Sequence, residues 1–172
     1  MKNDRSNIIK EYKKKLNLIK KLSECAGHVG IAGGQFLDLN YEKKNIDFKK
    51  IINMQRKKTG KLFEFCCLAP AIVAKKNTKT QKEMSKVGEE IGLLFQIADD
   101  LLDVKGNKKS TGKSVKKDKK KGKSTLIKLY GYEKTLGFAL DRKKMIINKL
   151  KKYGQKSNKL IEVSDFILNR SF

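Results

Sequence analysis

The sequence is poor in the residues that most often interrupt helices or build histidine chemistry. Among its 172 residues there is one proline, one histidine and no tryptophan. The single histidine, His28, excludes a histidine-rich metal site. No stretch reaches the roughly 18 consecutive apolar residues that a transmembrane helix requires. The lysine-rich N-terminus also lacks the apolar run of a signal peptide. We therefore expect a cytoplasmic protein with no membrane span.

Cysteine is scarce as well. The three cysteines are Cys25, Cys66 and Cys67. An odd number with two adjacent members fits neither a disulfide framework nor a four-ligand zinc site. We interpret them as reduced core residues.

Acidic residues are few, and the formal net charge is +24, from 42 Lys+Arg against 18 Asp+Glu. Such an excess can indicate a nucleic acid, an anionic membrane surface or a phosphorylated substrate. Nearly all of the positive charge is lysine, however, and the lysine-rich stretches lack the arginines and aromatics that nucleic-acid surfaces use. We expect no nucleic-acid partner and interpret much of the charge as a compositional bias.

What the sequence does contain is helical periodicity. Apolar residues recur at helical spacing and no segment alternates with period two, which predicts an all-α fold. The first predicted helix covers roughly residues 4–38 and carries an apolar stripe followed by a glycine-rich run. Because each glycine costs a helix about 1 kcal/mol, that run calls for close packing or a close ligand. After a loop at 40–47, a second predicted helix runs through Lys58, Thr59 and Gly60 to about Ala74. After a break at 75–80, further predicted helices cover residues 81–104, 125–130, 133–151 and 156–169.

The stretch GLLFQIADDLLDV places scarce acids inside an apolar helix. At 100° per residue, Gln96, Asp99, Asp100 and Asp103 fall within about 100° of one face, and Gly92 leaves that face unshielded. Carboxylates at i and i+4 repel by about 0.2–0.5 kcal/mol on an exposed helix, and by more where solvent is excluded. A Mg²⁺ ion held by carboxylates, water and substrate phosphate would cancel that repulsion.

Two other interpretations of these acids are weaker. A solvated face with three acids by chance does not fit the apolar flanks. A general acid–base pair for hydrolysis needs carboxylates on opposite sides of a substrate, which adjacent acids on one helix do not supply.

A lysine-rich, glycine-punctuated segment, residues 105–124, follows the aspartates. It predicts a solvated loop that would bind a polyphosphate opposite the metal. A P-loop is excluded, because Gly106 and Gly112 have one residue too many between them and the segment follows a helix.

Several motifs together resemble those of one family, the trans-type isoprenyl (polyprenyl) diphosphate synthases, and especially bacterial farnesyl diphosphate synthases (geranyltranstransferases). GLLFQIADDLLDV resembles their second aspartate-rich motif. The other matching stretches are GHVGIAGGQFLDL (27–39), KKTGKLFEF (57–65), TGKSVKKDKKKGKSTL (111–126) and SDFILNR (164–170). The resemblance implies the C-terminal half of an all-α bundle and an allylic diphosphate substrate, dimethylallyl or geranyl diphosphate.

The resemblance also implies roles for individual residues. Asp99 would ligate Mg²⁺, with Asp100 and Asp103 in support. Lys58, Lys113 and Lys123 would hold the diphosphate. Thr59 and Gln96 would lie beside the allylic carbon, and Gln35 and Asp38 would line the same cavity.

The sequence departs from the family pattern in its N-terminal part. The family's first aspartate-rich motif, its arginine pair and its basic patch for isopentenyl diphosphate have no counterpart here. We therefore expect one partial domain, residues 1–172, with 105–124 as its diphosphate-binding loop. We expect it to be inactive alone and to use isopentenyl diphosphate only when the missing half is supplied. We also expect it to form a homo-oligomer or to associate with an N-terminal half. The alternative is a non-catalytic subunit derived from a prenyl synthase.

Overall fold

The computed structural model describes residues 2–105 and 125–170, and the side chains of 5–104 and 125–170. Every regular element in these two segments is a helix, as the periodicity predicts. In chain order they are α1 (Lys2–Ala26), α2 (Ile31–Asn40), α3 (Phe48–Gln55), the π-helix η1 (Arg56–Gly60), α4 (Lys61–Val73), α5 (Thr78–Lys105), α7 (Leu126–Tyr130), α8 (Tyr132–Leu150), the 3₁₀-helix η2 (Lys151–Ser157) and α9 (Asn158–Asn169).

The prediction of one helix over residues 4–38 is wrong. The chain breaks between Ala26 and Ile31, so that α1 and α2 are separate helices. Gly30 lies at this break with a non-helical backbone, and a β-carbon there would overlap the backbone of Cys25. The glycine-rich run therefore makes a tight turn as well as a packing surface.

The helix that carries the aspartates begins earlier than predicted. Helix α5 starts at Thr78, inside the predicted break at 75–80. Lys75 reverses the chain with a left-handed backbone (φ 52°). The Asn77 side chain then accepts a hydrogen bond from the Thr80 backbone nitrogen at 2.9 Å. A polar side chain that accepts a hydrogen bond from a free backbone N–H at this position caps the N-terminus of a helix, so α5 begins directly after the turn.

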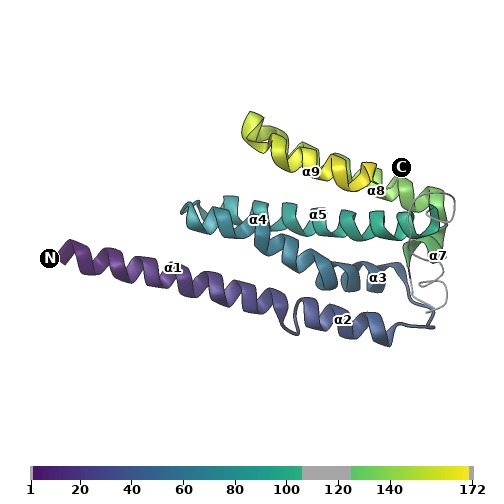
Figure 1. The fold of residues 1–172 in the computed structure, drawn as a ribbon, viewed down its shortest axis with the longest axis horizontal. Helices are drawn as coiled ribbons and strands as arrows, with labels where there is room; N and C mark the ends of the chain where they lie inside the picture. Colours follow the sequence, from purple (N-terminus) through teal and green to yellow (C-terminus); the bar gives the residue numbers. More distant parts are fainter. Residues whose placement is uncertain (1, 106–124, 171–172) are drawn as a thin grey trace.

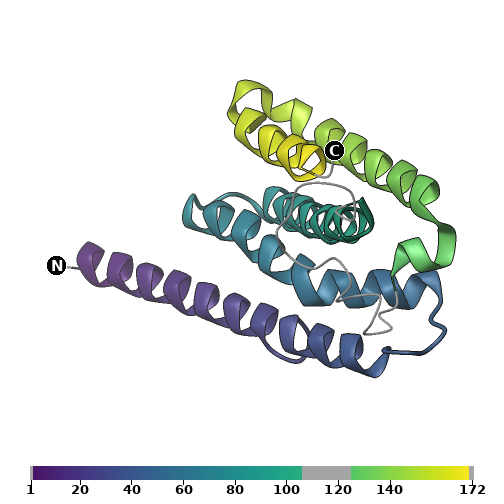
Figure 2. The same ribbon diagram turned by 45° about the vertical axis from the view of Figure 1, so that its right-hand side comes forward.

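The core forms around α5, which lies between the rod of α3, η1 and α4 on one side and the α8–α9 pair on the other (Figure 1). Helices α1 and α2 line the outer side of that rod, as the turned view also shows (Figure 2). Side chains at many successive positions of α5 are buried, because the helix has neighbours on several sides. The α5 core residues are Val87, Ile91, Leu93, Leu94, Ile97, Ala98 and Leu101.

The predicted apolar stripe of α1 is present, but it does not join this core. Its members are exposed by 43–65%. They are Ile8, Ile9, Tyr12, Leu16, Ile19 and Leu22. On α2, Phe36 and Leu39 are exposed as well. We call these eight residues the outer stripe.

The cysteines only partly follow their predicted burial. All three are free thiols. Cys25 is buried, whereas Cys66 is exposed, so the prediction of a core position is wrong for Cys66. Burial raises the pKa of the partly buried Cys67 to about 11. None of the helices in the described segments has the length and apolarity to cross a membrane.

Candidate functional site

The Lys-Thr-Gly element forms a π-helical turn that is pressed between two other helices. On one side lies Gly34 of α2, where a β-carbon would overlap the backbone of Lys58. On the other lies Gly92 of α5, where a β-carbon would come within 2.7 Å of the Gly60 Cα atom. Glycine is required where backbones approach this closely. The turn is therefore in direct backbone contact with both α2 and α5.

The Gly34 contact places two predicted site residues together. One helical turn after Gly34, Asp38 forms an ion pair with Lys58, with 2.6 Å between Oδ2 and Nζ. The two side chains are only 12% and 28% exposed. Gln35 is exposed on the same helix, and Thr59, next to Lys58, is partly buried. The structure thus pairs Lys58 directly with Asp38.

The Gly92 contact corrects one expectation about the aspartate helix. Gly92 does not leave an open face, because Gly60 and Phe63 lie against it. On the predicted face of α5, the first polar side chain after Gly92 is Gln96, one turn later. The Gln96 side-chain amide donates to Asp99 Oδ2 at 3.4 Å, so these two predicted residues are neighbours.

Asp99 has a second partner, Arg170, which follows the last residue of α9. The Arg170 Nη2 atom donates to Asp99 Oδ1 at 2.6 Å. The same guanidinium lies over the Phe95 ring, 4.1 Å from its centroid. Burial raises the pKa of Asp99 above its ordinary value, and the positive charge of Arg170 offsets only part of that rise.

Asp100 points to a different neighbour. Gln55, the last residue of α3, is 4% exposed, and its Nε2 atom donates to Asp100 Oδ2 at 3.0 Å. Asp103 is exposed one position before the described side chains of α5 end. The aspartates that the sequence predicts on one face are therefore oriented by two separate elements, α9 and α3.

Arg170 and Gln55 are the site residues that sequence reasoning misses. Both contacts join residues far apart in the chain, and one sequence does not reveal such pairs. One signal was available for Arg170, since arginine is rare in this chain and SDFILNR ends on it. For Gln55 no comparable signal exists.

A charge cluster centred on one buried carboxylate lies beside the site. Glu90, 7% exposed, accepts from Arg56 of η1 at 2.7 Å and lies 3.6 Å from Arg142 of α8. Breaking a buried ion pair by removing one partner leaves an uncompensated charge. This cluster ties η1 and α8 to α5 and so fixes the orientation of the Lys-Thr-Gly turn.

Comparisons with known proteins show the family of this chain. The family model described as polyprenyl synthetase matches residues 1–165. The chain belongs to the polyprenyl synthetase family. Among curated relatives, the farnesyl diphosphate synthase of Bacillus subtilis is 32% identical over 160 residues, which are 91% of this chain and 53% of that protein.

Solved structures of the family show the same all-α fold. An FPP/GFPP synthase from Zymomonas mobilis superposes with a TM-score of 0.77 at 31% identity, over 90% of this chain and 51% of that chain. A geranyltransferase from Helicobacter pylori, complexed with magnesium and isoprenyl diphosphate, superposes with a TM-score of 0.72 at 24% identity, over 92% and 52%. The chain spans about half the length of the curated relatives it matches.

The donor set of this polyprenyl synthetase chain fits Mg²⁺ rather than an all-protein metal cage. Within the two described segments, no three carboxylate, cysteine or histidine side chains gather as a metal cluster. Mg²⁺ commonly uses one or two carboxylates and completes its shell with water and substrate phosphate. Asp99 already holds a cationic group at 2.6 Å, so its position suits a cation. Lys113 and Lys123 lie outside the described residues.

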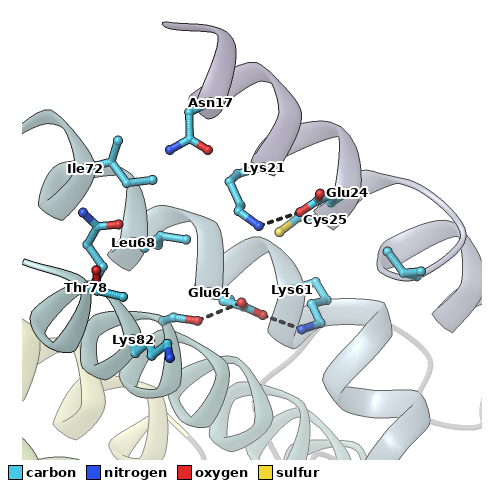
Figure 3. A pocket seen from close by; sticks show the side chains of 13 residues that line it. Asn17, Lys21, Glu24, Cys25, Lys61, Glu64, Leu68, Ile72, Thr78 and Lys82 are labelled. Carbon is cyan, nitrogen blue, oxygen red and sulfur yellow. Dashed lines mark hydrogen bonds and ion pairs between the residues drawn. The ribbon is translucent and has the colours of Figure 1, made fainter. Parts of the chain in front are cut away.

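A cavity of about 500 Å³ lies elsewhere, between α1, α4 and the beginning of α5 (Figure 3). Its polar centre is Glu64, which accepts from Lys61 at 2.6 Å and from Ser85 at 2.8 Å. Lys21 and Glu24 of α1 pair with each other on the facing wall at 2.8 Å. None of the predicted site residues lines this cavity. The acids there are already paired with lysines, and we assign it no ligand.

Proposed function

We propose that this chain supplies one half of the active site of a trans-isoprenyl diphosphate synthase of the farnesyl diphosphate synthase type. The reaction is the condensation of isopentenyl diphosphate with an allylic diphosphate, dimethylallyl or geranyl diphosphate. The carbon–oxygen bond to the allylic diphosphate breaks, the double bond of isopentenyl diphosphate attacks the allylic carbon, and a proton is lost.

One observation supports the proposal most strongly. The turn that holds Lys58 and Thr59 is fixed by backbone contact to α2 and α5, the two helices that carry Asp38 and the aspartates. A diphosphate needs cationic and metal-binding groups held at fixed separations, and positioned charges stabilise developing charge best when they do not have to reorganise. The family membership gives this arrangement its chemical meaning.

Each residue of the chain has a proposed part. Lys58 binds diphosphate oxygens, and Asp38 keeps its ammonium group in place until the substrate arrives. Lys113 and Lys123 would add positive charge from the 105–124 loop. Asp99, with Asp100 and Asp103, would hold Mg²⁺ on the diphosphate. When bound, that ion acts as a Lewis acid on the departing diphosphate.

Thr59 and Gln96 lie beside these groups and are proposed to stabilise charge at the allylic carbon. Gln96 also donates to Asp99, so it links the metal-binding carboxylate to the reacting centre. Gln35 and Asp38 would line the same cavity on the α2 side.

We propose a cytoplasmic protein whose single domain is completed by a chain that carries the first aspartate-rich motif, and which associates with further copies of itself or with that chain. The outer stripe supports this, because contiguous exposed apolar surface marks interaction sites. Leu16 and Tyr12 are 65% and 62% exposed in the chain alone.

Reconstitution tests this proposal. The purified chain would be mixed with the part of the Bacillus subtilis farnesyl diphosphate synthase that it does not match, in the presence of Mg²⁺, isopentenyl diphosphate and geranyl diphosphate. We expect farnesyl product only when both chains are present, and none above the blank for this chain alone. Product from this chain alone would contradict the expected dependence on a partner. No product from the mixture, despite complex formation, would contradict the proposed activity.

A second candidate function is a non-catalytic subunit that binds a complete synthase through the outer stripe. The exposed stripe favours it as much as it favours a split enzyme. The two differ in one result, because a subunit without chemistry should bind a complete synthase but never restore activity to the N-terminal part alone. A well-behaved monomer at high concentration in light scattering would count against both.

A further inference from the structure

We infer that Arg170 occupies the position of a cation on Asp99 in the metal-free protein, and that a divalent metal must displace it. Arg170 is then a positioning residue that holds the Asp99 carboxylate ready and also competes for it. This inference rests on the proposed function, because it takes Asp99 to be the metal-binding carboxylate.

Arg170 is held in place by the well-packed helix α9 that precedes it. Ile167 and Leu168 of α9 are 3% and 2% exposed and belong to the core. The Arg170 Nε atom donates to the Ile167 carbonyl oxygen at 3.3 Å, and the Phe95 ring lies under the guanidinium. Stacking on an aromatic face and a fixed hydrogen bond both limit the freedom of an arginine side chain. The contact with Asp99 is therefore a defined arrangement.

Two cations cannot use the same oxygen from the same side. Arg170 Nη2 lies 2.6 Å from Asp99 Oδ1, and Gln96 approaches Oδ2 at 3.4 Å. A carboxylate oxygen that binds Mg²⁺ lies about 2.0–2.1 Å from the ion. A metal at Oδ1 and the guanidinium would then be close enough to repel strongly. A metal that binds Oδ1 thus competes with the Arg170–Asp99 bond.

Metal binding distinguishes this inference from a purely structural role of Arg170. Mn²⁺ would be titrated into the wild-type chain and Arg170→Gln, with free Mn²⁺ followed by electron paramagnetic resonance. Arg5→Gln, on the exposed surface of α1, removes the same charge away from the site and serves as control. Since a half-buried ion pair that is still reached by solvent is a modest competitor, we expect Arg170→Gln to bind Mn²⁺ about two- to fivefold more tightly, and Arg5→Gln to match wild type. Asp99→Asn should abolish the binding in either background.

A second readout follows the pair without relying on the metal affinity. A double-mutant cycle of Arg170→Gln and Asp99→Asn in urea should show favourable coupling in EDTA, and that coupling should vanish in saturating MgCl₂. Coupling that persists unchanged in MgCl₂ would overturn the inference. So would equal or weaker Mn²⁺ binding by Arg170→Gln, or no binding by any of the proteins. If Arg170→Gln does not fold, Arg170→Lys keeps the charge but loses the fork and should give a smaller tightening.

These failures differ from failure of the proposed function. Equal Mn²⁺ affinity of wild type and Arg170→Gln, with turnover in the reconstituted enzyme, would remove the inference and leave the proposed function in place. Tighter Mn²⁺ binding by Arg170→Gln, without turnover in the reconstituted enzyme, would leave the inference in place and remove the proposed function.

Discussion

Helices α1 and α5 are both long and both carry many apolar side chains, yet those of α5 are buried and those of the α1 stripe are exposed. Leu94 and Leu101 of α5 are fully buried, whereas Leu16 of α1 is 65% exposed. The difference lies in the neighbours, because α5 is enclosed by the α3–α4 rod and the α8–α9 pair, while α1 lies outside the rod (Figure 2). An apolar pattern reports what a helix is suited to pack against, and α1 is suited to a surface that the described residues do not supply.

The largest expected effect comes from making the same leucine-to-alanine substitution in both helices. Leu94→Ala should lower the free energy of unfolding by about 2–5 kcal/mol, because it leaves a cavity in the core. Leu16→Ala should change it by no more than about 0.5 kcal/mol, because that side chain is mostly exposed. Urea unfolding followed by circular dichroism measures both. Equal losses would show that α1 is buried in solution, for example by self-association.

The next effect tests the contact between α5 and the Lys-Thr-Gly turn. Gly92→Ala should cost about 1–3 kcal/mol, because its β-carbon would lie 2.7 Å from the Gly60 backbone and neither backbone can move freely. Gly137→Ala in α8 is the control, since nothing lies within 4 Å of a β-carbon there. That variant should gain up to about 1 kcal/mol from helix propensity. A Gly92→Ala protein as stable as wild type would contradict the packing described.

The smallest effect concerns the charge of Asp99. Because the folded-state pKa of Asp99 is raised, the neutral form stabilises the fold, fully so below the ordinary value of 3.8, and this is lost as pH rises through the folded-state pKa. Asp99→Asn stays neutral, so it should be slightly more stable than wild type at pH 7 and equal to it below about pH 3.8. Urea unfolding at both pH values measures this.

Asp141→Asn on the exposed surface of α8 provides the comparison for that measurement. It should follow wild type at both pH values. If Asp99→Asn were instead less stable than wild type at pH 7, the ion pair with Arg170 would outweigh the cost of burying the carboxylate.

The sequence predicts the helices and the family well, because periodicity and motif order are local properties. It fails where the decisive contact is tertiary. The break at Gly30, the packing of Gly92 on Gly60 and the bonds from Arg170 and Gln55 to the aspartates all depend on how helices meet. The roles of Lys113 and Lys123 stay predictions, since those residues lie outside the described segments.

The measurement that tests the central claim most directly is turnover of the reconstituted enzyme with Asp99→Asn beside Asp141→Asn. If Asp99 holds the metal on the allylic diphosphate, its loss removes several kcal/mol of transition-state stabilisation, or about a hundredfold or more in rate. We predict that loss for Asp99→Asn and wild-type turnover for Asp141→Asn. Equal turnover by the two variants would contradict the assignment of this chain as the metal-binding half of a prenyl synthase.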